Sequence, residues 1–219
     1  MTFRKQTLRY FFSVEGETED LYLKRLQTLI NSEPSANYKV SLDSKVEKDP
    51  VKRAKSINIT GKTKITHWYD YESNQPVHTT QFQTMIDRLR QTEKLGKQIN
   101  YSLGYSNFTF ELWIILHKND SNRPYQDRSQ YLQPINSAYA EQFANLDTYK
   151  QKDNFNRVLG KISLQDVKMA VTRAKKIMEN NVGNGYQELQ YKKYTFYREN
   201  PSLTIWESVD QILEDCGLN

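Results

Sequence analysis

The chain has 219 residues, enough for one domain of ordinary size or for a core with an addition. Its single cysteine, Cys216, excludes a disulfide framework or a thiolate zinc site within one chain. The net charge of +5, from 31 basic and 26 acidic residues, is compatible with a phosphate-bearing partner without identifying one. Because no apolar run approaches the roughly 20 residues of a membrane helix, and residues 1–6 are polar, we expect a cytoplasmic protein without a membrane partner.

The first half of the chain alternates between strand and helix patterns. The expected strands cover residues 8–14, 38–42, 64–70 and 99–103, and the expected helices lie near 18–31, 50–57 and 80–95. Pro50 stands at the first position of the second helix, where proline is favoured. This alternation predicts an α/β fold, layered around a mainly parallel sheet of about four strands.

Residues 107–118 form an apolar run that periodicity alone assigns to neither a helix nor a strand. We favour a helix, because Ser106 and Asn107 are both good N-cap residues. Glu111 interrupts this run, and burying a carboxylate without a partner is costly. Glu111 should therefore have a partner or lie at the rim of a cavity.

The second half of the chain is mainly helical. After a polar connector, helical patterns cover residues 134–145, 164–181 and 203–215. Tyrosines and lysines over residues 191–197 fit a hairpin with one aromatic face as well as a base-stacking surface. We therefore predict an α/β core over residues 1–118 and a helical appendage over 119–219 that packs on it.

Acidic residues follow two of the predicted strands. Glu15 comes directly after the first strand, and Gly16 then permits a tight turn into a helix whose first turn holds Glu19. Asp70 and Glu72 close the third strand, and side chains two apart in an extended chain point the same way. Each cluster alone has a simpler explanation, as a complement to a helix dipole or as loop acids. Together, at successive strand ends, they predict an oxygen-ligand site for Mg²⁺ or Mn²⁺.

Three segments resemble the signatures of the RloB-like family, Toprim-related proteins of phage defence that are often encoded beside an AAA-type ATPase. The segments are Val14 to Glu19, Asp70-x-Glu72, and Ser106 to His117. The resemblance extends over most of the chain, including Tyr149-Lys150 and Asn200-Pro201-Ser202. Two positions depart from the family pattern: Glu72 replaces the usual aspartate, and Phe108 replaces a proline.

The resemblance implies a Toprim-like catalytic core and a metal-dependent nuclease that acts in abortive infection. Glu15, Asp70, Glu72 and Glu111 would be catalytic, and Glu15, Glu19, Asp70 and Glu72 would hold Mg²⁺ or Mn²⁺. In Toprim proteins the glutamate of the first motif performs acid–base work, which here implies Glu15. The expected partners are DNA or RNA and an AAA-type ATPase.

Four further residues are candidates for substrate binding: Ser106, Asn107, His117 and Lys150. Each also has a simpler explanation: Ser106 and Asn107 as helix caps, His117 as a hydrogen-bonded histidine at a helix end, and Lys150 as an exposed lysine. A competing function is a non-catalytic nucleic-acid-binding or sensing subunit, and another is phosphoryl transfer on a small nucleotide. The sequence leaves open whether the chain acts as a homo-oligomer.

Overall fold

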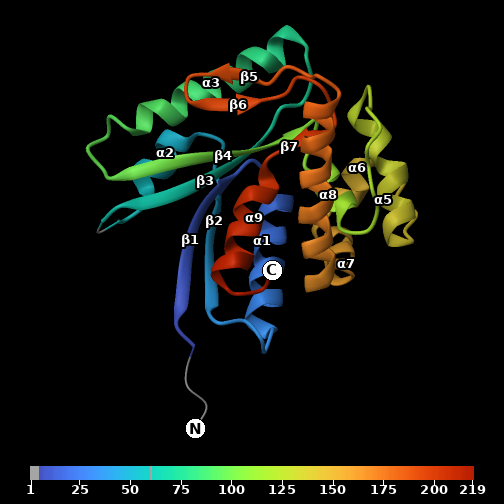
Figure 1. Ribbon diagram of the computed structural model, residues 1–219, viewed down its shortest axis with the longest axis horizontal. Coiled ribbons are helices and arrows are strands. Elements are labelled where there is room, and N and C mark those ends of the chain that lie inside the picture. Colours follow the sequence, from blue (N-terminus) through green and yellow to red (C-terminus); the bar gives the residue numbers. More distant parts are fainter. Residues whose placement is uncertain (1–4, 60) are drawn as a thin grey trace.

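The core of the fold is a twisted sheet, seen in the computed structural model over the described residues 5–59 and 61–219 (Figure 1). Within this part of the chain the sheet has five strands in the order β2-β1-β3-β4-β7. The first four are parallel: β1 (Thr7–Val14), β2 (Lys39–Val46), β3 (Thr63–Asp70) and β4 (Ile99–Asn107). The short β7 (Ser202–Leu203) is antiparallel to β4. The predicted α/β fold with a mainly parallel sheet is confirmed.

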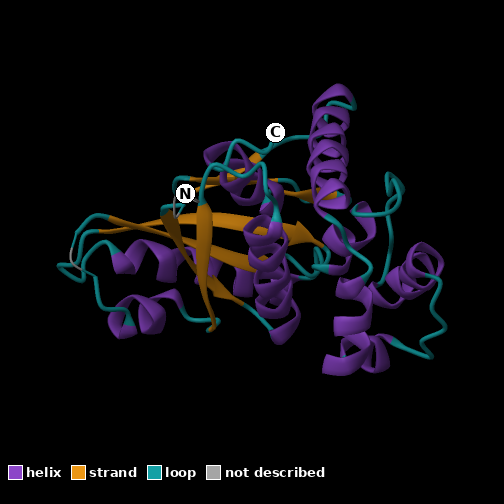
Figure 2. Cartoon of the chain, turned by 90° about the horizontal axis from the view of Figure 1, so that it is seen from below, coloured by secondary structure: helices purple, strands orange, loops and turns teal. Residues whose placement is uncertain are grey.

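Helices cover both faces of the sheet (Figure 2). One face packs against α1 (Glu17–Ser32) and α9 (Ile205–Asp215), and the other packs against α2 (Pro50–Ser56) and α3 (Pro76–Thr92). A hairpin of β5 (Leu189–Tyr191) and β6 (Tyr194–Phe196) lies against α3, as the aromatic-face interpretation predicts. No helix in the described part of the chain is long and apolar enough to cross a membrane.

The remaining helices lie beside α1, beyond one edge of the sheet (Figure 1). They are α4 (Glu111–Leu116), α5 (Leu132–Tyr139), α6 (Leu146–Lys150), α7 (Lys152–Gly160) and α8 (Leu164–Gly183), with a short 3₁₀ turn, η1 (Arg128–Tyr131), before α5. The fully buried α4 supplies apolar residues to the larger core cluster, which also receives residues from α1, α8 and α9. The segments after residue 118 therefore share one hydrophobic core with the sheet.

The predicted cap of the helix over residues 107–118 is wrong. β4 continues to Asn107, and α4 begins only at Glu111 after Phe110, whose side chain makes no cap hydrogen bond. The Asn107 amide instead donates to the carbonyl oxygens of residues 197, 198 and 199 at 3.2, 2.9 and 3.1 Å. Tertiary hydrogen bonds have therefore displaced the local preference for an N-cap.

The C-terminal segment is built into the sheet. Ser106 and Asn107 of β4 pair with Leu203 and Ser202 of β7. Gly104 of β4 leaves no room for a side chain. A Cβ there would lie 2.8 Å from Trp68 Cδ1 of β3 and 3.3 Å from Ile205 Cα at the start of α9. The division of the chain near residue 118 stays a prediction, but the sheet and its core extend across it.

Side chains of α1 close the outer edge of the sheet at β2. Asn31 accepts from the Val40 N–H at 2.7 Å and donates to the Val40 carbonyl at 2.9 Å, so its amide acts as a neighbouring strand would. The Leu42 N–H donates to Gln27 Oε1 at 2.7 Å. Unpaired strand edges invite pairing between molecules, and these amides occupy the groups that would pair.

Asn31→Ala is therefore expected to lower the free energy of unfolding by about 1–3 kcal/mol, since it leaves two backbone groups of Val40 without partners. It should also increase self-association through β2. Urea unfolding and light scattering measure the two effects. Asn156→Ala, at an exposed position of α7, is the matched control. Equal behaviour of the two variants would contradict the edge-closing role.

Candidate active site

Four acids gather where β1, β3 and β4 end. Glu15 follows β1 directly, Asp70 is the last residue of β3, and Glu111 begins α4 after β4. Glu19 lies in the first turn of α1. Parallel strands place their carboxyl ends at one edge of a sheet, which explains why residues distant in sequence meet here. Glu111 is fully buried, and Glu19 and Asp70 are 5% and 8% exposed.

Direct contacts join these acids. Glu15 Oε2 accepts the backbone N–H of Asp70 at 3.1 Å. The Thr109 hydroxyl lies 3.1 Å from Asp70 Oδ2 and also contacts Glu111 Oε2. A hydroxyl has one proton to donate, so Thr109 satisfies only one of the two carboxylates at a time. The other carboxylate needs a proton or a cation.

Burial and mutual repulsion disfavour the ionised forms of two of the acids. The pKa of Glu19 is raised to about 7, first by burial and then by the charges of Glu15 and Glu111. The pKa of Asp70 is raised well above its usual range by burial and by the charges of Glu15, Glu19 and Glu111. A cation placed among these acids would relieve that repulsion, so the cluster favours cation binding.

Two basic residues compensate part of the negative charge. Lys48 Nζ lies 2.8 Å from Glu15 Oε1, and Lys150 Nζ lies 2.9 Å from Glu111 Oε1. Burial acts to raise the pKa of Glu111, but the charge of Lys150 and the hydrogen bond from Thr109 outweigh it and hold that pKa below its usual value. Glu111 is therefore an ion-paired carboxylate, whereas Asp70 has no such counterion within the described residues.

Glu72 does not have the extended backbone conformation that the sequence predicts for it. β3 ends at Asp70, and Glu72 has φ +63°, in the left-handed region. Its carboxylate lies 3.1 Å from His78 Nε2 and 3.4 Å from Arg128 Nη1. The alternation of an extended chain therefore does not hold Asp70 and Glu72 as neighbours on one face.

Of the four predicted substrate-binding residues, Lys150 is the one whose side chain contacts an acid within the described part of the chain. Asn107 holds the C-terminal segment, and Ser106, beside it in β4, has a buried hydroxyl without a partner. His117 lies in the core with Nε2 3.1 Å from the Tyr22 hydroxyl and Nδ1 2.9 Å from the Trp113 carbonyl. Burial lowers the pKa of His117 to about 4, so it is neutral at physiological pH.

Thr109, Lys48 and Arg128 belong to the site although the sequence did not single them out. Thr109 stands inside the third family-like segment, where its hydroxyl was the available signal. Lys48 follows β2, so the strand-end argument applied to the acids could have found it. Arg128 lies in the polar connector, and no local pattern marks it.

A hollow of about 650 Å³ opens beside Glu15 and Glu72. Lys48, Tyr69 and Arg88 line it, together with His78, Asp49 and residues of α3. The hollow therefore combines carboxylates with two basic side chains and an aromatic ring. Both basic side chains are paired with carboxylates of the same lining, Lys48 with Glu15 and Arg88 with Asp49.

The donor set fits a hard divalent cation held mainly by two carboxylates. No group of three histidine, cysteine, aspartate or glutamate side chains suited to a metal ion occurs in the described residues. The Glu15 carboxylate accepts the backbone N–H of Asp70, however, and the side-chain donor atoms of both residues are oxygens. Mg²⁺ commonly uses one or two carboxylates and keeps several waters, so this pair meets its requirements. Glu19 and Glu72 stay predicted ligands.

The raised pKa of Glu19 predicts how stability depends on pH without divalent cations. Its pKa is 4.5 ordinarily and about 7 in the fold, so between these values the folded protein binds a proton that the unfolded chain does not. The resulting contribution to the stability of the fold is complete below pH 4.5 and is lost as the pH rises through about 7. Asp70 acts in the same direction.

We therefore expect the unfolding temperature in EDTA to rise as the pH falls from about 8 to about 5. Glu19→Gln should flatten this dependence, and Glu17→Gln, at an exposed position, should leave it unchanged. Thermal unfolding across the pH range measures it. If the unfolding temperature of Glu19→Gln varies with pH as much as that of the unmodified protein, groups other than Glu19 cause the dependence.

The comparisons with known proteins identify the family of the chain. No curated protein and no solved structure matches the chain. The family model described as RloB-like protein matches residues 10–212, a range that includes all four acids and Lys150. The chain therefore belongs to the RloB-like family.

Proposed function

We propose that the protein is a Mg²⁺- or Mn²⁺-dependent nuclease that cleaves phosphodiester bonds of nucleic acids. The observation that carries the proposal is the cluster of four acids from successive strand ends, in which Asp70 keeps a raised pKa although the charge of Lys150 acts to lower it. A scaffold would gain nothing from burying acids that repel one another, since each costs free energy unless compensated. A site built for a cation explains their burial.

Glu15 and Asp70 would hold the cation, with Glu19 and Glu72 as further ligands. Such a cation polarises a phosphoryl oxygen and activates water for attack. Thr109 orients Asp70 by a hydrogen bond of 3.1 Å, and the Asp70 N–H in turn fixes Glu15 at 3.1 Å. The protein's own part is therefore to hold two carboxylates in a fixed relation before any ligand arrives.

The basic groups around the acids would bind the phosphates of the substrate. Lys48 and Arg88 line the hollow beside Glu15, and Tyr69 offers a ring on which a base could stack. Lys150 is paired with Glu111, another acid of the cluster, at 2.9 Å. A nucleic-acid strand lying in the hollow would pass directly by Glu15.

The proposed biological role rests on the family resemblance. RloB-like proteins resemble Toprim-related proteins of phage defence, so we propose a cytoplasmic role in abortive infection together with an AAA-type ATPase. The side chains of the acid cluster support the cleavage reaction, and the family resemblance supports the role in defence. The two parts of the proposal are tested separately.

Cleavage is tested by incubating the purified protein with labelled plasmid DNA, single-stranded DNA and tRNA in Mg²⁺, Mn²⁺ or EDTA. We expect cleavage that needs a divalent cation and that falls at least about 100-fold in Glu15→Gln and in Asp70→Asn. Glu17→Gln, two residues from Glu15 and exposed, is the matched control. Cleavage that persists in both site variants would reject this site.

A second candidate function is a nucleic-acid-binding or sensing subunit without catalysis. It is favoured by the lack of a three-ligand metal group in the described residues and by the Lys150 ammonium beside Glu111. This function predicts tight binding without cleavage under all cation conditions. Filter binding beside the cleavage assay separates the two functions.

A further inference from the structure

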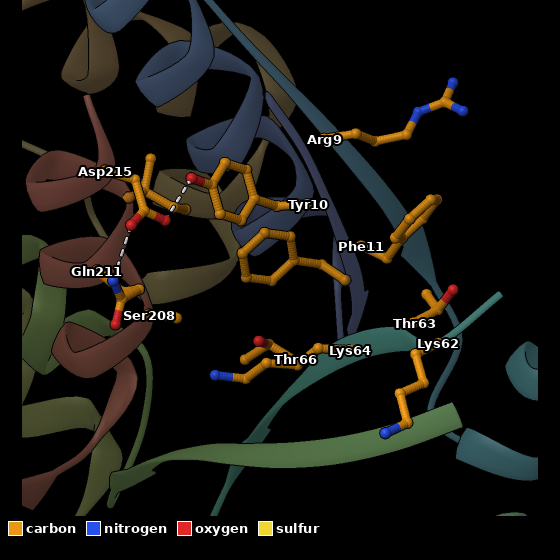
Figure 3. A pocket seen from close by; sticks show the side chains of 12 residues that line it. Arg9, Tyr10, Phe11, Lys62, Thr63, Lys64, Thr66, Ser208, Gln211 and Asp215 are labelled. Carbon is orange, nitrogen blue, oxygen red and sulfur yellow. Dashed lines mark hydrogen bonds between the residues drawn. The ribbon is translucent and has the colours of Figure 1, made fainter. Parts of the chain in front are cut away.

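β1 and β3 separate towards their N-terminal ends. They pair only over Phe11–Ser13 and Ile65–His67, although β1 begins at Thr7 and β3 at Thr63. Each of them pairs along its full length with its other neighbour, β2 or β4. The sheet therefore divides between residues 7–10 and residues 62–64, and we call this gap the fork (Figure 3).

A hollow of about 410 Å³ occupies the fork. Tyr10 and Phe11 both line it, as do Thr63 and Lys64. Successive side chains of a strand point to opposite faces of the sheet, so a hollow that touches both faces lies in the plane of the sheet itself. Residues of α9, among them Ser208 and Asp215, close one side (Figure 3).

The strands expose free backbone groups to the fork. The Lys39 N–H donates to the Gln6 carbonyl, so Gln6 faces β2, and by alternation Thr7 and Arg9 face the fork. Likewise the Thr63 N–H donates to the Gln98 carbonyl next to β4, so the Lys64 N–H points towards β1, one residue before the first paired residue, Ile65. Among the described residues, no strand lies opposite Thr7 or Arg9 on this side.

This open edge contrasts with the other edges of the sheet. Asn31 and Gln27 occupy the outward groups of β2, and β7 pairs with the end of β4. Proteins close strand edges that would otherwise recruit foreign strands. At the fork, no such cover lies over Thr7 and Arg9 among the described residues, as a surface for strand addition requires.

The fork is also positively charged. Arg9, Lys62 and Lys64 line it and are exposed, and the Arg9 guanidinium lies 5.6 Å from the centre of the Phe11 ring. The acid in the lining, Asp215, already accepts from the Tyr10 hydroxyl at 2.7 Å and from Gln211 Nε2 at 2.9 Å. A ligand in the fork therefore meets three exposed basic groups, and none of them forms a salt bridge within the described part of the chain.

We propose that the fork binds an extended acidic segment of a partner protein by strand addition. The backbone of that segment pairs with the groups of Thr7 and Arg9 that face the fork, and its carboxylates contact the basic side chains. Free strand edges recognise a peptide backbone, which distinguishes this ligand from a nucleic acid. The fork lies at the N-terminal ends of the strands, away from the acids, so this inference does not depend on the proposed nuclease function.

Fluorescence anisotropy with labelled peptides tests the proposal. The probe is a peptide of about eight alternating valine and glutamate residues, and its partner has lysine in place of glutamate. We expect the acidic peptide to bind at least tenfold more tightly than the basic one. A central proline, which removes a backbone donor, should weaken binding by a similar factor. Peptide binding should also slow amide exchange over residues 7–10.

Arg9→Glu combined with Lys64→Glu should abolish binding of the acidic peptide. Lys152→Glu combined with Lys176→Glu makes the same charge change at two exposed helical positions and should preserve binding. No binding at about 1 mM peptide overturns the proposal. Equal binding of the proline-containing peptide also overturns it. So does a single-stranded oligonucleotide that binds more tightly than the acidic peptide and does not bind the fork variant.

Discussion

Asp70→Asn is expected to stabilise the protein in EDTA while abolishing its response to divalent cations. In the fold, burial and three neighbouring acids raise the pKa of Asp70, so its charge costs free energy at neutral pH. Asparagine keeps an oxygen that can accept from Thr109, which now lies 3.1 Å from Asp70 Oδ2, and removes the charge. The gain should be about 1 kcal/mol or more, equivalent to about 2–4 °C in unfolding temperature.

Thermal unfolding of the two proteins, with EDTA and with Mg²⁺ or Mn²⁺, measures both effects. The cation should raise the unfolding temperature of the unmodified protein, because a ligand that binds only the folded state stabilises it. The variant should show no such increase. Asp153→Asn, at an exposed position in the first turn of α7, is the matched control and should keep the cation response. A variant that is destabilised in EDTA, or that still responds to the cation, contradicts the assignment of Asp70.

Lys150→Met is expected to lower the free energy of unfolding by about 2–4 kcal/mol. Glu111 is fully buried, and Lys150, whose side chain is 32% exposed, is its ion-pair partner at 2.9 Å. Removing one member of a buried pair leaves the other charge without compensation. Without Lys150 the pKa of Glu111 rises, so the deficit should be smaller at about pH 5 than at about pH 8.

A second substitution tests whether the pair itself causes the loss. Glu111→Gln added to Lys150→Met removes the isolated charge and should recover most of the stability. Lys152→Met, two residues further on and exposed, controls for the loss of a lysine. Urea unfolding of the four proteins measures the effect. No recovery in the double variant would show that Lys150 stabilises the fold by contacts other than with Glu111.

The sheet could be predicted because its main strands carry complete patterns. β1 and β3 each have eight residues of apolar or alternating character, bounded by turns or acids. The two residues of β7 are too few to form a pattern, so the antiparallel fifth strand was not predicted. The start of α4 was placed too early because the cap preference of Ser106 and Asn107 is local, whereas contacts with residues 197–203 are not.

The candidate acids could be located from strand ends, but their partners could not. Glu15, Asp70 and Glu111 each stand next to a strand or helix boundary, which local patterns reveal. The ion pairs of Arg128 with Glu72 and of Lys150 with Glu111 join segments that are distant in the sequence. The spacing of residues along the chain does not reveal such contacts. The left-handed backbone of Glu72 is likewise uncommon for its residue type, so the sequence favoured an extended conformation.

The hydrogen bonds of Asn107 have a consequence for how the protein is made. Its amide is held by the carbonyls of residues 197–199, and the segment that carries Thr109 and Glu111 follows it directly. During synthesis those carbonyls leave the ribosome after almost all of the chain, since folding begins from the N-terminus. The segment that carries Glu111 is therefore fixed in place last. Under the proposed nuclease function, a nascent chain would be unable to attack the nucleic acids of the ribosome that is producing it, and cleavage would begin only after its release.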